Sequence, residues 1–370
     1  IKKVIYRLYK KLQNCPFIVT VSSYFYVRVY KRFYYKKYVS IPDIKISPGL
    51  PKIVFICDEM TWQDFRNECN AIFITPYNWR EVFKSFSPDI FFCESAWSGI
   101  SEYNNCWRGQ IYRNKKVRYE NRRELMNILE YCKNNNIPTV FWNKEDPAFW
   151  DNETYNFVDT ALHFDHIFTT AKECIPKYTE LGHKSVDVLM FGVPTHIFFF
   201  DPEVKKVRKA VFAGSWYADQ PERCKEMEKV FDMVLQYGIP LEIYDRQSDS
   251  SNPIHKFPEK YKKYLRPKVP YFELGKIYRE AQYVININTV TNSETMFARR
   301  VFEAMACGCI IISNHSDGLK KLFPGRIWFA DQPFEHEKEK EIIMKNLHDV
   351  LENHTCNKRL SKVLRICGIN

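Results

Sequence analysis

A helix start, a carboxylate and a buried strand follow one another from residue 293, where the segment 293–308 reads SETMFARRVFEAMACG and leads into an apolar run. We expect its helix to begin near Ser293, just after a strand over 283–288. Unpaired N–H groups and the helix dipole make such a helix start attractive to anions. Glu303, about two turns further on, can accept hydrogen bonds from ribose hydroxyls. The combination suits a nucleotide diphosphate.

This segment resembles the donor-site signature of GT-B glycosyltransferases, and more closely that of the bacterial CgeB-like group, also called glycosyl transferases group 1. The resemblance extends over residues 50–330 through further stretches in the same order. They read DEMT, ESAWSG, PTVFWNKEDP, FAGSWY and EIYDR and begin at Asp58, Glu94, Pro138, Phe212 and Glu242. The resemblance implies two doubly wound, Rossmann-like α/β domains that face each other across a cleft, with a nucleotide-diphosphate sugar as the donor.

The order of apolar and polar segments predicts the same architecture, because alternating buried strands and helices are typical of parallel sheets covered on both faces. We expect a basic aromatic arm over 1–48, an acceptor domain over 49–197 and a donor domain over 198–335. C-terminal helices over 336–370 would pack back toward the first domain, as they commonly do in GT-B proteins. The predicted strands cover 52–57, 71–75, 89–94, 139–143, 166–170 and 186–191, then 208–214, 241–245, 283–288, 309–313 and 327–330, and the clearest helices cover 121–134, 221–236 and 272–281.

Ligands of doubly wound sheets bind beyond the carboxyl ends of the strands, and in the second domain this rule selects small and polar residues. Gly214 ends a predicted strand and permits a close backbone approach to a ligand; a simple turn glycine is the alternative. The start of the signature helix would offer a hydroxyl and N–H groups to the phosphates. The donor-binding candidates are Gly214, Ser215, Arg246, Ser293, Thr295, Met296, Arg300 and Glu303.

Arginines supply the expected cations of the donor site. Arg299 and Arg300 are adjacent, so they point about 100° apart on a helix, and we favour Arg300 as the one that faces the diphosphate. A guanidinium binds phosphate bidentately and would stabilise the charge that the leaving diphosphate gains in the transition state. Arg246 is a second candidate, with a salt bridge to Asp245 or Glu242 as the alternative.

Glu303 also has a structural alternative, an ion pair with Arg299 or Arg300 on the helix surface. Many retaining GT-B enzymes place a second Glu at a fixed spacing before this one. The nearest candidate here, Glu294, lies one position further away than that pattern. The departure leaves the role of Glu294 open.

Polar residues also follow a buried strand of the first domain, in NKEDP at 143–147. Glu145 or Asp146 could be the base that deprotonates an acceptor hydroxyl if the reaction inverts the anomeric centre; if it retains, they would orient a sugar. A helix N-cap at Asp146, before Pro147, is the structural alternative. The acceptor-binding candidates, as polar groups for hydroxyls or aromatic faces for sugar rings, are Glu94, Trp97, Asn143, Lys144 and His196.

Metal and cofactor motifs are missing from the sequence. No DxD motif stands in a convincing context, since Asp245 is followed two places on by Gln247, and the GxGxxG fingerprint of NAD enzymes is absent. We therefore expect neither metal nor cofactor, with arginine and the helix dipole taking the metal's place. The 12 cysteines are scattered singly, which indicates reduced thiols in a cytosolic chain.

The formal net charge of +11 is concentrated at one end of the chain. The first forty residues carry ten Lys or Arg, eleven Tyr or Phe and no acid. One interpretation is a helix on an anionic membrane surface; the other is a helix packed on the protein. Nucleic acid fits weakly, because no recognised module is visible. Apolar residues at helical spacing in this arm are Ile1, Val4, Ile5, Leu8 and Leu12.

These features predict a metal-independent bacterial glycosyltransferase of cell-envelope polysaccharide biosynthesis. It would move a sugar from a nucleotide-diphosphate donor to a surface-glycan or lipid-linked acceptor. No apolar run approaches the length of a membrane span, so we expect a cytoplasmic protein, peripheral on the inner face of the plasma membrane. The alternatives are a nucleotide-sugar epimerase or phosphopolyol transferase on the same fold, or a non-catalytic glycan- or nucleic-acid-binding module.

Overall fold

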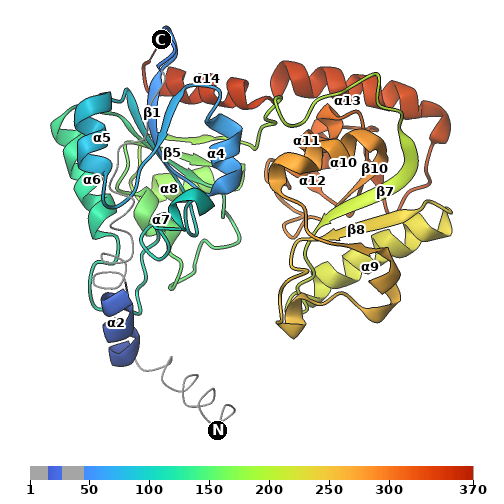
Figure 1. Ribbon diagram of the computed structural model, residues 1–370, viewed down its shortest axis with the longest axis horizontal. Helices are drawn as coiled ribbons and strands as arrows, with labels where there is room; N and C mark the ends of the chain where they lie inside the picture. Colours follow the sequence, from blue (N-terminus) through green and yellow to red (C-terminus); the bar gives the residue numbers. More distant parts are fainter. Residues whose placement is uncertain (1–15, 27–45, 370) are drawn as a thin grey trace. The chain divides into compact units, whose positions relative to one another are not determined.

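The structure, a computed structural model, describes residues 16–26 and 46–369 (Figure 1). The chain falls into two compact units: unit 1 takes the residues up to Leu189 and those from Val363, and unit 2 spans 190–362. Among the described residues, every helix is too short or too polar to cross a bilayer. The first helix predicted in the basic arm lies outside the described residues.

Unit 1 is built on a parallel sheet of six strands in the order β2-β1-β3-β4-β5-β6. Every residue of β3 and β4 is buried, as expected for strands covered on both faces. The strand order reverses between β1 and β3. The strands are β1 (Lys52–Ile56), β2 (Asn70–Phe73), β3 (Ile90–Glu94), β4 (Thr139–Asn143), β5 (His166–Thr169) and β6 (Val186–Val188).

The helices that cover this sheet bury their apolar side chains against it, whereas no described side chain of the N-terminal helix over 16–24 is buried. In α6, residues Leu125, Ile128, Leu129 and Cys132 are buried, which is the helical spacing of an amphipathic helix. The longer helices of this unit are α2 (Pro16–Tyr24), α4 (Glu59–Phe65), α5 (Trp79–Phe86), α6 (Arg123–Asn134), α7 (Phe157–Ala161) and α8 (Ile175–Glu180).

Unit 2 has its own parallel sheet of six strands, in the order β12-β11-β10-β7-β8-β9. The order reverses between β7 and β10, as in a doubly wound dinucleotide-binding sheet. The strands are β7 (Val207–Gly214), β8 (Leu241–Asp245), β9 (Leu265–Arg266), β10 (Ala281–Asn286), β11 (Ile310–Ser313) and β12 (Trp328–Phe329). Two six-stranded parallel sheets confirm the predicted fold class.

Alternate residues of the central strands of unit 2 enter two separate cores, one on each face of the sheet. Val211 and Val284 pack with Phe302, whereas Phe212 packs with Phe231. Figure 1 shows α9 on one face and α10, α11 and α12 on the other. The helices are α9 (Pro221–Gln236), α10 (Leu274–Glu280), α11 (Arg300–Ala306), α12 (Asp317–Leu322), α13 (Glu339–Asn353) and α14 (Cys356–Ile366), the last of which ends in unit 1.

The signature helix begins later than the sequence predicts. α11 starts at Arg300 and has seven residues, and irregular turns precede it. Ser293 Oγ accepts a hydrogen bond from the N–H of Met296 (3.0 Å), and Asn288 Oδ1 accepts one from the N–H of Ala298 (3.1 Å). Side-chain oxygens therefore occupy backbone donors that were expected to be free. The prediction of a helix N-terminus near Ser293 is wrong.

Candidate functional site

The first part of the candidate donor site lies at the carboxyl end of β7, beside the reversal of strand order in unit 2. Gly214 ends β7, and a Cβ added there would lie 2.5 Å from the ring of Phe212. Glycine is therefore required by the ring that folds over the strand end, whatever a ligand does. Ser215 follows and is buried. This corner of the sheet is where ligands of doubly wound folds bind.

Three guanidinium groups converge on this strand end. Arg223 Nη1 donates to the carbonyl oxygen of Ser215 (3.1 Å) and Arg246 Nε donates to its Oγ (3.4 Å). Arg300 Nη2 donates to the carbonyl oxygen of Ala213. Within the described part of the chain, none of the three arginines forms an ion pair with a carboxylate. The salt bridge considered as an alternative for Arg246 is therefore not formed.

The three arginines repel one another. Burial lowers the pKa of Arg223, and the charges of Arg300 and Arg246 lower it further. Burial alone would raise the pKa of the nearby Tyr217 phenol, yet Arg246 and other neighbours lower it. Like charges held together without a counter-ion are costly, so a bound dianion would relieve the repulsion and gain charge-assisted hydrogen bonds. The arrangement has the chemistry of a diphosphate site.

Arg299 and Arg300 point apart, as their adjacency predicts. The Arg300 guanidinium lies over the ring of Phe212 at 4.9 Å, and its buried Nε has no hydrogen-bond partner among the described residues. The Arg299 guanidinium lies over the ring of Phe191 at 4.8 Å. The structure thus brings Arg300 into the arginine cluster.

Glu303 lies in the first turn of α11, one turn after Arg300 rather than two turns into a longer helix. Its side chain is 2% exposed, and Oε1 accepts a hydrogen bond from the hydroxyl of Tyr271 (2.7 Å). Glu294 instead forms an exposed ion pair with Lys321 (2.6 Å). Of the two glutamates, Glu303 is the one inside the molecule beside the arginine cluster.

Two buried amides at the end of β10 have unused hydrogen-bonding atoms. Asn286 Nδ2 donates to Ser313 Oγ (3.1 Å), and Asn288 Oδ1 accepts from the N–H of Ala298. Asn286 Oδ1 and Asn288 Nδ2 are buried without a partner among the described residues. An unpaired buried polar atom is costly, so a polar ligand group would stabilise this corner.

Sequence reasoning missed Arg223 and the two asparagines as candidates. Arg223 stands in the first turn of the helix that follows β7, and its side chain reaches back to the strand end. Asn286 and Asn288 were counted within a strand, although polar residues at the end of a buried strand are themselves a signal. Both positions follow the rule of carboxyl strand ends.

In unit 1, the corresponding reversal of strand order lies between β1 and β3, and Asp58 stands at its centre. The Asp58 carboxylate accepts backbone hydrogen bonds from Trp97 (2.7 Å), Ser98 (3.0 Å) and Gly99 (2.7 Å). These bonds hold the turn after β3. Trp97 is thereby fixed at the edge of the sheet, with its ring half-buried.

Glu94 is turned inward, which differs from the predicted acceptor contact. Its side chain is fully buried, its Oε1 accepts from the N–H of Asp58 (2.5 Å), and its Oε2 lies 2.7 Å from Lys144 Nζ. Burial raises the pKa of Glu94 and the Lys144 ammonium opposes that rise. Lys144 also donates to Thr61 Oγ1 (3.2 Å). The buried contact between Glu94 and Lys144 therefore links the carboxyl ends of β3 and β4.

Asp146 is likewise an internal residue, because its carboxylate accepts three hydrogen bonds from buried side chains. The donors are Asn143 Nδ2 (2.8 Å), Thr169 Oγ1 (2.7 Å) and Tyr178 OH (3.0 Å). Burial raises the pKa of Asp146 to about 7. No helix starts at Pro147, so the N-cap alternative is wrong. Asp146 and Asn143 are each 1% exposed, so neither reaches an acceptor directly.

Glu145 is the accessible carboxylate of the NKEDP segment. It is half-buried, and Oε1 accepts a hydrogen bond from the indole Nε1 of Trp97 (3.0 Å). Burial raises the pKa of Glu145, against the charge of Lys144 and the indole bond. The structure thus distinguishes the accessible Glu145 from the enclosed Asp146, whereas sequence reasoning named both as candidate bases. His196, the last acceptor candidate, is an exposed residue of unit 2.

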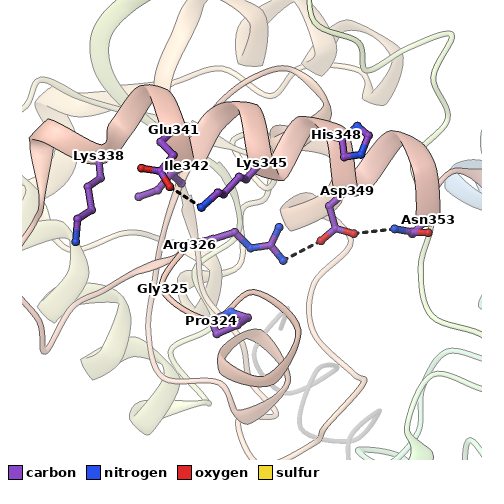
Figure 2. Close-up of a pocket in the computed structure, with 10 residues that line it drawn as sticks. All are labelled: Pro324, Gly325, Arg326, Lys338, Glu341, Ile342, Lys345, His348, Asp349 and Asn353. Carbon is purple, nitrogen blue, oxygen red and sulfur yellow. Dashed lines mark hydrogen bonds and ion pairs between the residues drawn. The ribbon is translucent and has the colours of Figure 1, made fainter.

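Two cavities lie elsewhere in unit 2. One, of about 460 Å³, lies between α13 and the turn at 324–326 (Figure 2). Its cations have carboxylate partners, for example Arg326 with Asp349 at 2.8 Å. The other, of about 600 Å³, adjoins the end of β8 and is lined by Asp245 and Phe257 among others. Neither offers the uncompensated charge of the arginine cluster.

In the part of the chain that the structure describes, no group of three or more His, Cys, Asp or Glu side chains could hold a metal ion. The cysteines described there are free thiols, all buried except the half-buried Cys367.

Comparisons with known proteins indicate the fold of glycosyltransferases. Residues 235–365 match the family model described as glycosyl transferase-like. No curated protein sequence matches the chain. The solved structure of Anabaena Alr3699/HepE in complex with UDP and glucose has a TM-score of 0.53 at 10% identity, covering 85% of this chain and 99% of that one. A glycosyltransferase from Rickettsia africae ESF-5 has a TM-score of 0.52 at 12% identity, covering 86% and 98%.

A UDP-GlcNAc 2-epimerase from Methanocaldococcus jannaschii also matches, with a TM-score of 0.43 at 11% identity over 85% of this chain and 99% of that one. Nothing about activity follows from a likeness of that degree. The two stronger likenesses establish the fold, while the narrower CgeB-like group stays a prediction. The chain therefore has the two-domain GT-B fold of glycosyltransferases, and its residues 235–365 carry the match to the glycosyl transferase-like family.

Proposed function

We propose that this protein transfers a glycosyl group from a nucleotide-diphosphate sugar to an acceptor hydroxyl. The observation that carries the proposal is the cluster of Arg223, Arg246 and Arg300 at the end of β7, three cations without a carboxylate partner among the described residues. The fold is that of a protein crystallised with UDP and glucose. UDP is therefore the first nucleotide to test.

In this proposal the arginines hold the diphosphate and stabilise the charge that it gains as the glycosidic bond breaks. Glu303, which also accepts a hydrogen bond from the Tyr271 hydroxyl (2.7 Å), is the candidate acceptor for a ribose hydroxyl. Three fixed cations would take the place of a divalent ion, so we propose metal-independent transfer. Ser293 Oγ accepts hydrogen bonds from the N–H groups of Thr295 (3.4 Å) and Met296 (3.0 Å), so the phosphate contacts predicted for these N–H groups are not part of the proposal.

On the acceptor side, Glu145 is the candidate base, since it is the half-buried carboxylate with a raised pKa. A base with a pKa nearer to neutrality accepts a hydroxyl proton more readily at physiological pH. If the reaction retains the anomeric configuration, Glu145 would instead orient a sugar hydroxyl.

Calorimetry with UDP, GDP, CDP and dTDP tests the donor half of the proposal. We expect micromolar to millimolar binding of one nucleotide, UDP first, without added metal and undiminished by EDTA. Binding of none of the four would contradict the proposal. Binding that requires a divalent ion would contradict metal independence alone.

The products discriminate the competing enzymes on this fold. A transferase releases a nucleoside diphosphate when an acceptor is supplied. An epimerase converts the donor without an acceptor, and a phosphopolyol transferase releases a nucleoside monophosphate. A non-catalytic module turns over none of these donors.

We further propose that the acceptor is a surface glycan or its lipid-linked precursor at an anionic membrane. Support comes from α2 and the residue that follows it, whose apolar side chains are exposed: Phe17 and Val21 of α2 are 66% and 52% exposed, and Phe25 is 59% exposed. The first forty residues add ten Lys or Arg. Apolar side chains with flanking cations suit an anionic bilayer surface.

Vesicle flotation tests the membrane proposal. The full chain should float with phosphatidylglycerol vesicles, stay behind with pure phosphatidylcholine, and be released at high salt. Phe17→Ser combined with Phe25→Ser should abolish flotation, whereas Leu181→Ser, at a site 54% exposed elsewhere in unit 1, should not. Equal flotation of both variants would contradict a role for α2.

A further inference from the structure

Five aromatic side chains gather beside Glu145 in unit 1. Their ring centroids lie 5.1–6.4 Å apart, mostly edge to face. They come from two connections, one between β3 and α6 and the other from the end of β4 to the first residue of α7. The residues are Trp97, Tyr112, Phe149, Tyr155 and Phe157.

This aromatic cluster is not a closed core. Phe157 is buried, but Trp97, Tyr112 and Phe149 are half-buried and Tyr155 is 36% exposed. Aromatic rings kept at a surface mark a place where a ligand or partner covers them. The cluster also follows the carboxyl ends of β3 and β4, which is the ligand-binding edge of a doubly wound sheet.

A carboxylate with one oxygen available for hydrogen bonding lies at the edge of the aromatic cluster. Glu145 Oε1 accepts from Trp97 Nε1, and Oε2 has no hydrogen-bond partner among the described residues. A carboxylate accepts hydrogen bonds from hydroxyls and repels phosphates. The cluster therefore presents apolar faces together with an acceptor for neutral, hydroxyl-bearing molecules.

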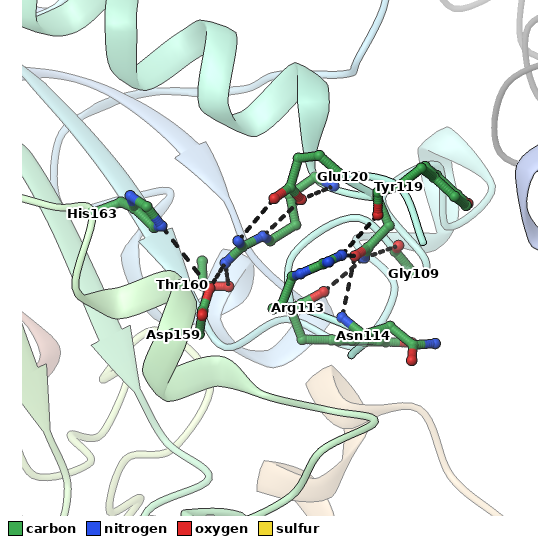
Figure 3. A network of polar contacts seen from close by, with 11 residues as sticks. Gly109, Arg113, Asn114, Tyr119, Glu120, Asp159, Thr160 and His163 are labelled. Atoms are coloured by element: carbon green, nitrogen blue, oxygen red, sulfur yellow. Dashed lines mark hydrogen bonds and ion pairs between the residues drawn. The ribbon is translucent and has the colours of Figure 1, made fainter. Parts of the chain in front are cut away.

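A network of polar contacts holds the loops that carry these rings (Figure 3). The backbone of Arg113, next to Tyr112, exchanges two hydrogen bonds with that of Asn156 (3.0 and 3.1 Å), which lies between Tyr155 and Phe157. The buried Asn121 Nδ2 also donates to the carbonyl oxygen of Tyr112 (2.7 Å). The two aromatic loops are thereby tied together through their backbones.

Arg122 fixes the same loops to α7. This buried guanidinium binds both carboxylate oxygens of Glu120 (3.0 Å each) and contacts Asp159 Oδ1 (2.7 Å) and Thr160 Oγ1 (2.8 Å). α7 begins at Phe157, the buried ring of the cluster. A site whose loops are fixed before binding loses less entropy when a ligand arrives.

We propose that the aromatic cluster and Glu145 form a carbohydrate subsite, so that the group which accepts the transferred sugar belongs to a glycoside. The C–H face of a pyranose ring lies on an aromatic face, most accessibly Tyr155, while a ring hydroxyl donates to Glu145. The subsite stands on its own contacts, and only its identification as the acceptor site rests on the proposed function. A lipid phosphate or another anion is disfavoured by the carboxylate.

Saturation-transfer NMR on the full chain tests the subsite, with methyl α- and β-glycosides of glucose, galactose, mannose and N-acetylglucosamine titrated into the millimolar range. At least one glycoside should bind. Tyr155→Ala should weaken that binding about 3- to 10-fold, since one aromatic face is lost. Tyr155→Leu, which keeps apolar bulk without the ring, gives the same test if the alanine variant does not fold.

Tyr237→Ala is the matched control, because Tyr237 is 41% exposed, stacks on Phe334 at 4.4 Å and lies in unit 2. It should leave glycoside binding unchanged. Absence of binding by every glycoside, or equal affinity of the Tyr155 variants and the wild type, overturns the subsite. UDP affinity is measured on the same samples. Loss of UDP binding with glycoside binding intact refutes the donor proposal alone, and the reverse result refutes the subsite alone.

Discussion

At the scale of single residues, three arginine charges at the end of β7 are the basis of the proposed diphosphate site. Arg223, Arg246 and Arg300 each spend one guanidinium N–H on a neutral oxygen of the strand end. Their charge is left for an anion, because neutral acceptors do not compensate it. Arginines such as Arg80, which lies 3.4 Å from Glu124, instead have a carboxylate beside them.

Arg300→Ala should weaken UDP binding about 10- to 100-fold, because charge-assisted hydrogen bonds contribute roughly 1.5–3 kcal/mol each. Calorimetry measures the change. Arg299→Ala is the matched control: its guanidinium lies over Phe191 rather than at the strand end, so UDP affinity should stay within about twofold of the wild type. Equal losses in both variants would show that the whole helix start, not Arg300, governs binding.

Asp146 differs from these arginines, because its carboxyl group is enclosed by protein and is not available to a ligand. Its pKa rises from 3.8 to about 7 on burial. The folded carboxyl holds its proton more tightly than the unfolded one, so the free energy of unfolding should fall as pH rises from about 4 to 7 and then level off. The total change is a few kcal/mol, at about 1.4 kcal/mol per pKa unit.

Urea unfolding at pH 4.5, 6 and 8, roughly spanning that window, checks this prediction. Asp146→Asn should flatten the pH dependence, while Asp151→Asn, at an exposed site nearby, should leave it as in the wild type. An unchanged slope in Asp146→Asn would mean that the carboxyl is ionised in the folded protein throughout.

At the scale of elements, the loops after the strands are held as firmly as the strands themselves. Asp58 binds three successive N–H groups of the turn after β3. Arg122 joins the loop before α6 to the start of α7. Such internal bonds allow a long, polar loop to hold a site in place, although a loop of this composition is usually mobile.

Arg122→Ala should destabilise unit 1 by about 1–3 kcal/mol, because it removes a buried guanidinium and its hydrogen bonds, while water still reaches the carboxylates of Glu120 (40% exposed) and Asp159 (39% exposed). The neighbouring Arg123→Ala is the control: that side chain is 62% exposed and pairs only loosely with Glu124 (3.5 Å), so little change is expected. Chemical denaturation followed by tryptophan fluorescence measures both. A loss of less than about 1 kcal/mol in Arg122→Ala would contradict a structural role for this network.

At the scale of the whole molecule, each of the two doubly wound units contains one candidate site. The arginine cluster and Glu303 belong to unit 2, and Glu145 with the aromatic cluster belongs to unit 1. Each unit has its own reversal of strand order and therefore its own ligand-binding edge. In the proposed reaction, the edge in unit 2 would bind the charged donor and the edge in unit 1 the neutral acceptor.

Hydrogen exchange with and without UDP tests this division. At a hundredfold excess over Kd, UDP should stabilise unit 2 by about 2.7 kcal/mol. Peptides that contain β7 (Val207–Gly214) and α11 (Arg300–Ala306) should gain protection, while a peptide that contains β1 (Lys52–Ile56) should not. Protection confined to unit 1 would place the nucleotide on the other sheet.

The sequence by itself determined the fold class, because continuous apolar runs such as residues 310–312, alternating with helical segments, are typical of a parallel sheet covered on both faces. It also determined which small or polar residues stand at strand ends, including Gly214 and the NKEDP segment. These features are local, so spacing and residue type suffice to read them.

Only the tertiary structure decided which of those residues are enclosed and which remain accessible. Glu94 is paired with Lys144, and Asp146 accepts a hydrogen bond from Tyr178; both partners are distant in the sequence. Glu145, next to Asp146, has one carboxylate oxygen without a hydrogen-bond partner among the described residues. Arg223 belongs to the candidate donor site because its side chain, in the first turn of α9, reaches the end of β7. Burial and charge compensation depend on contacts between distant segments, and spacing along the chain carries no record of them.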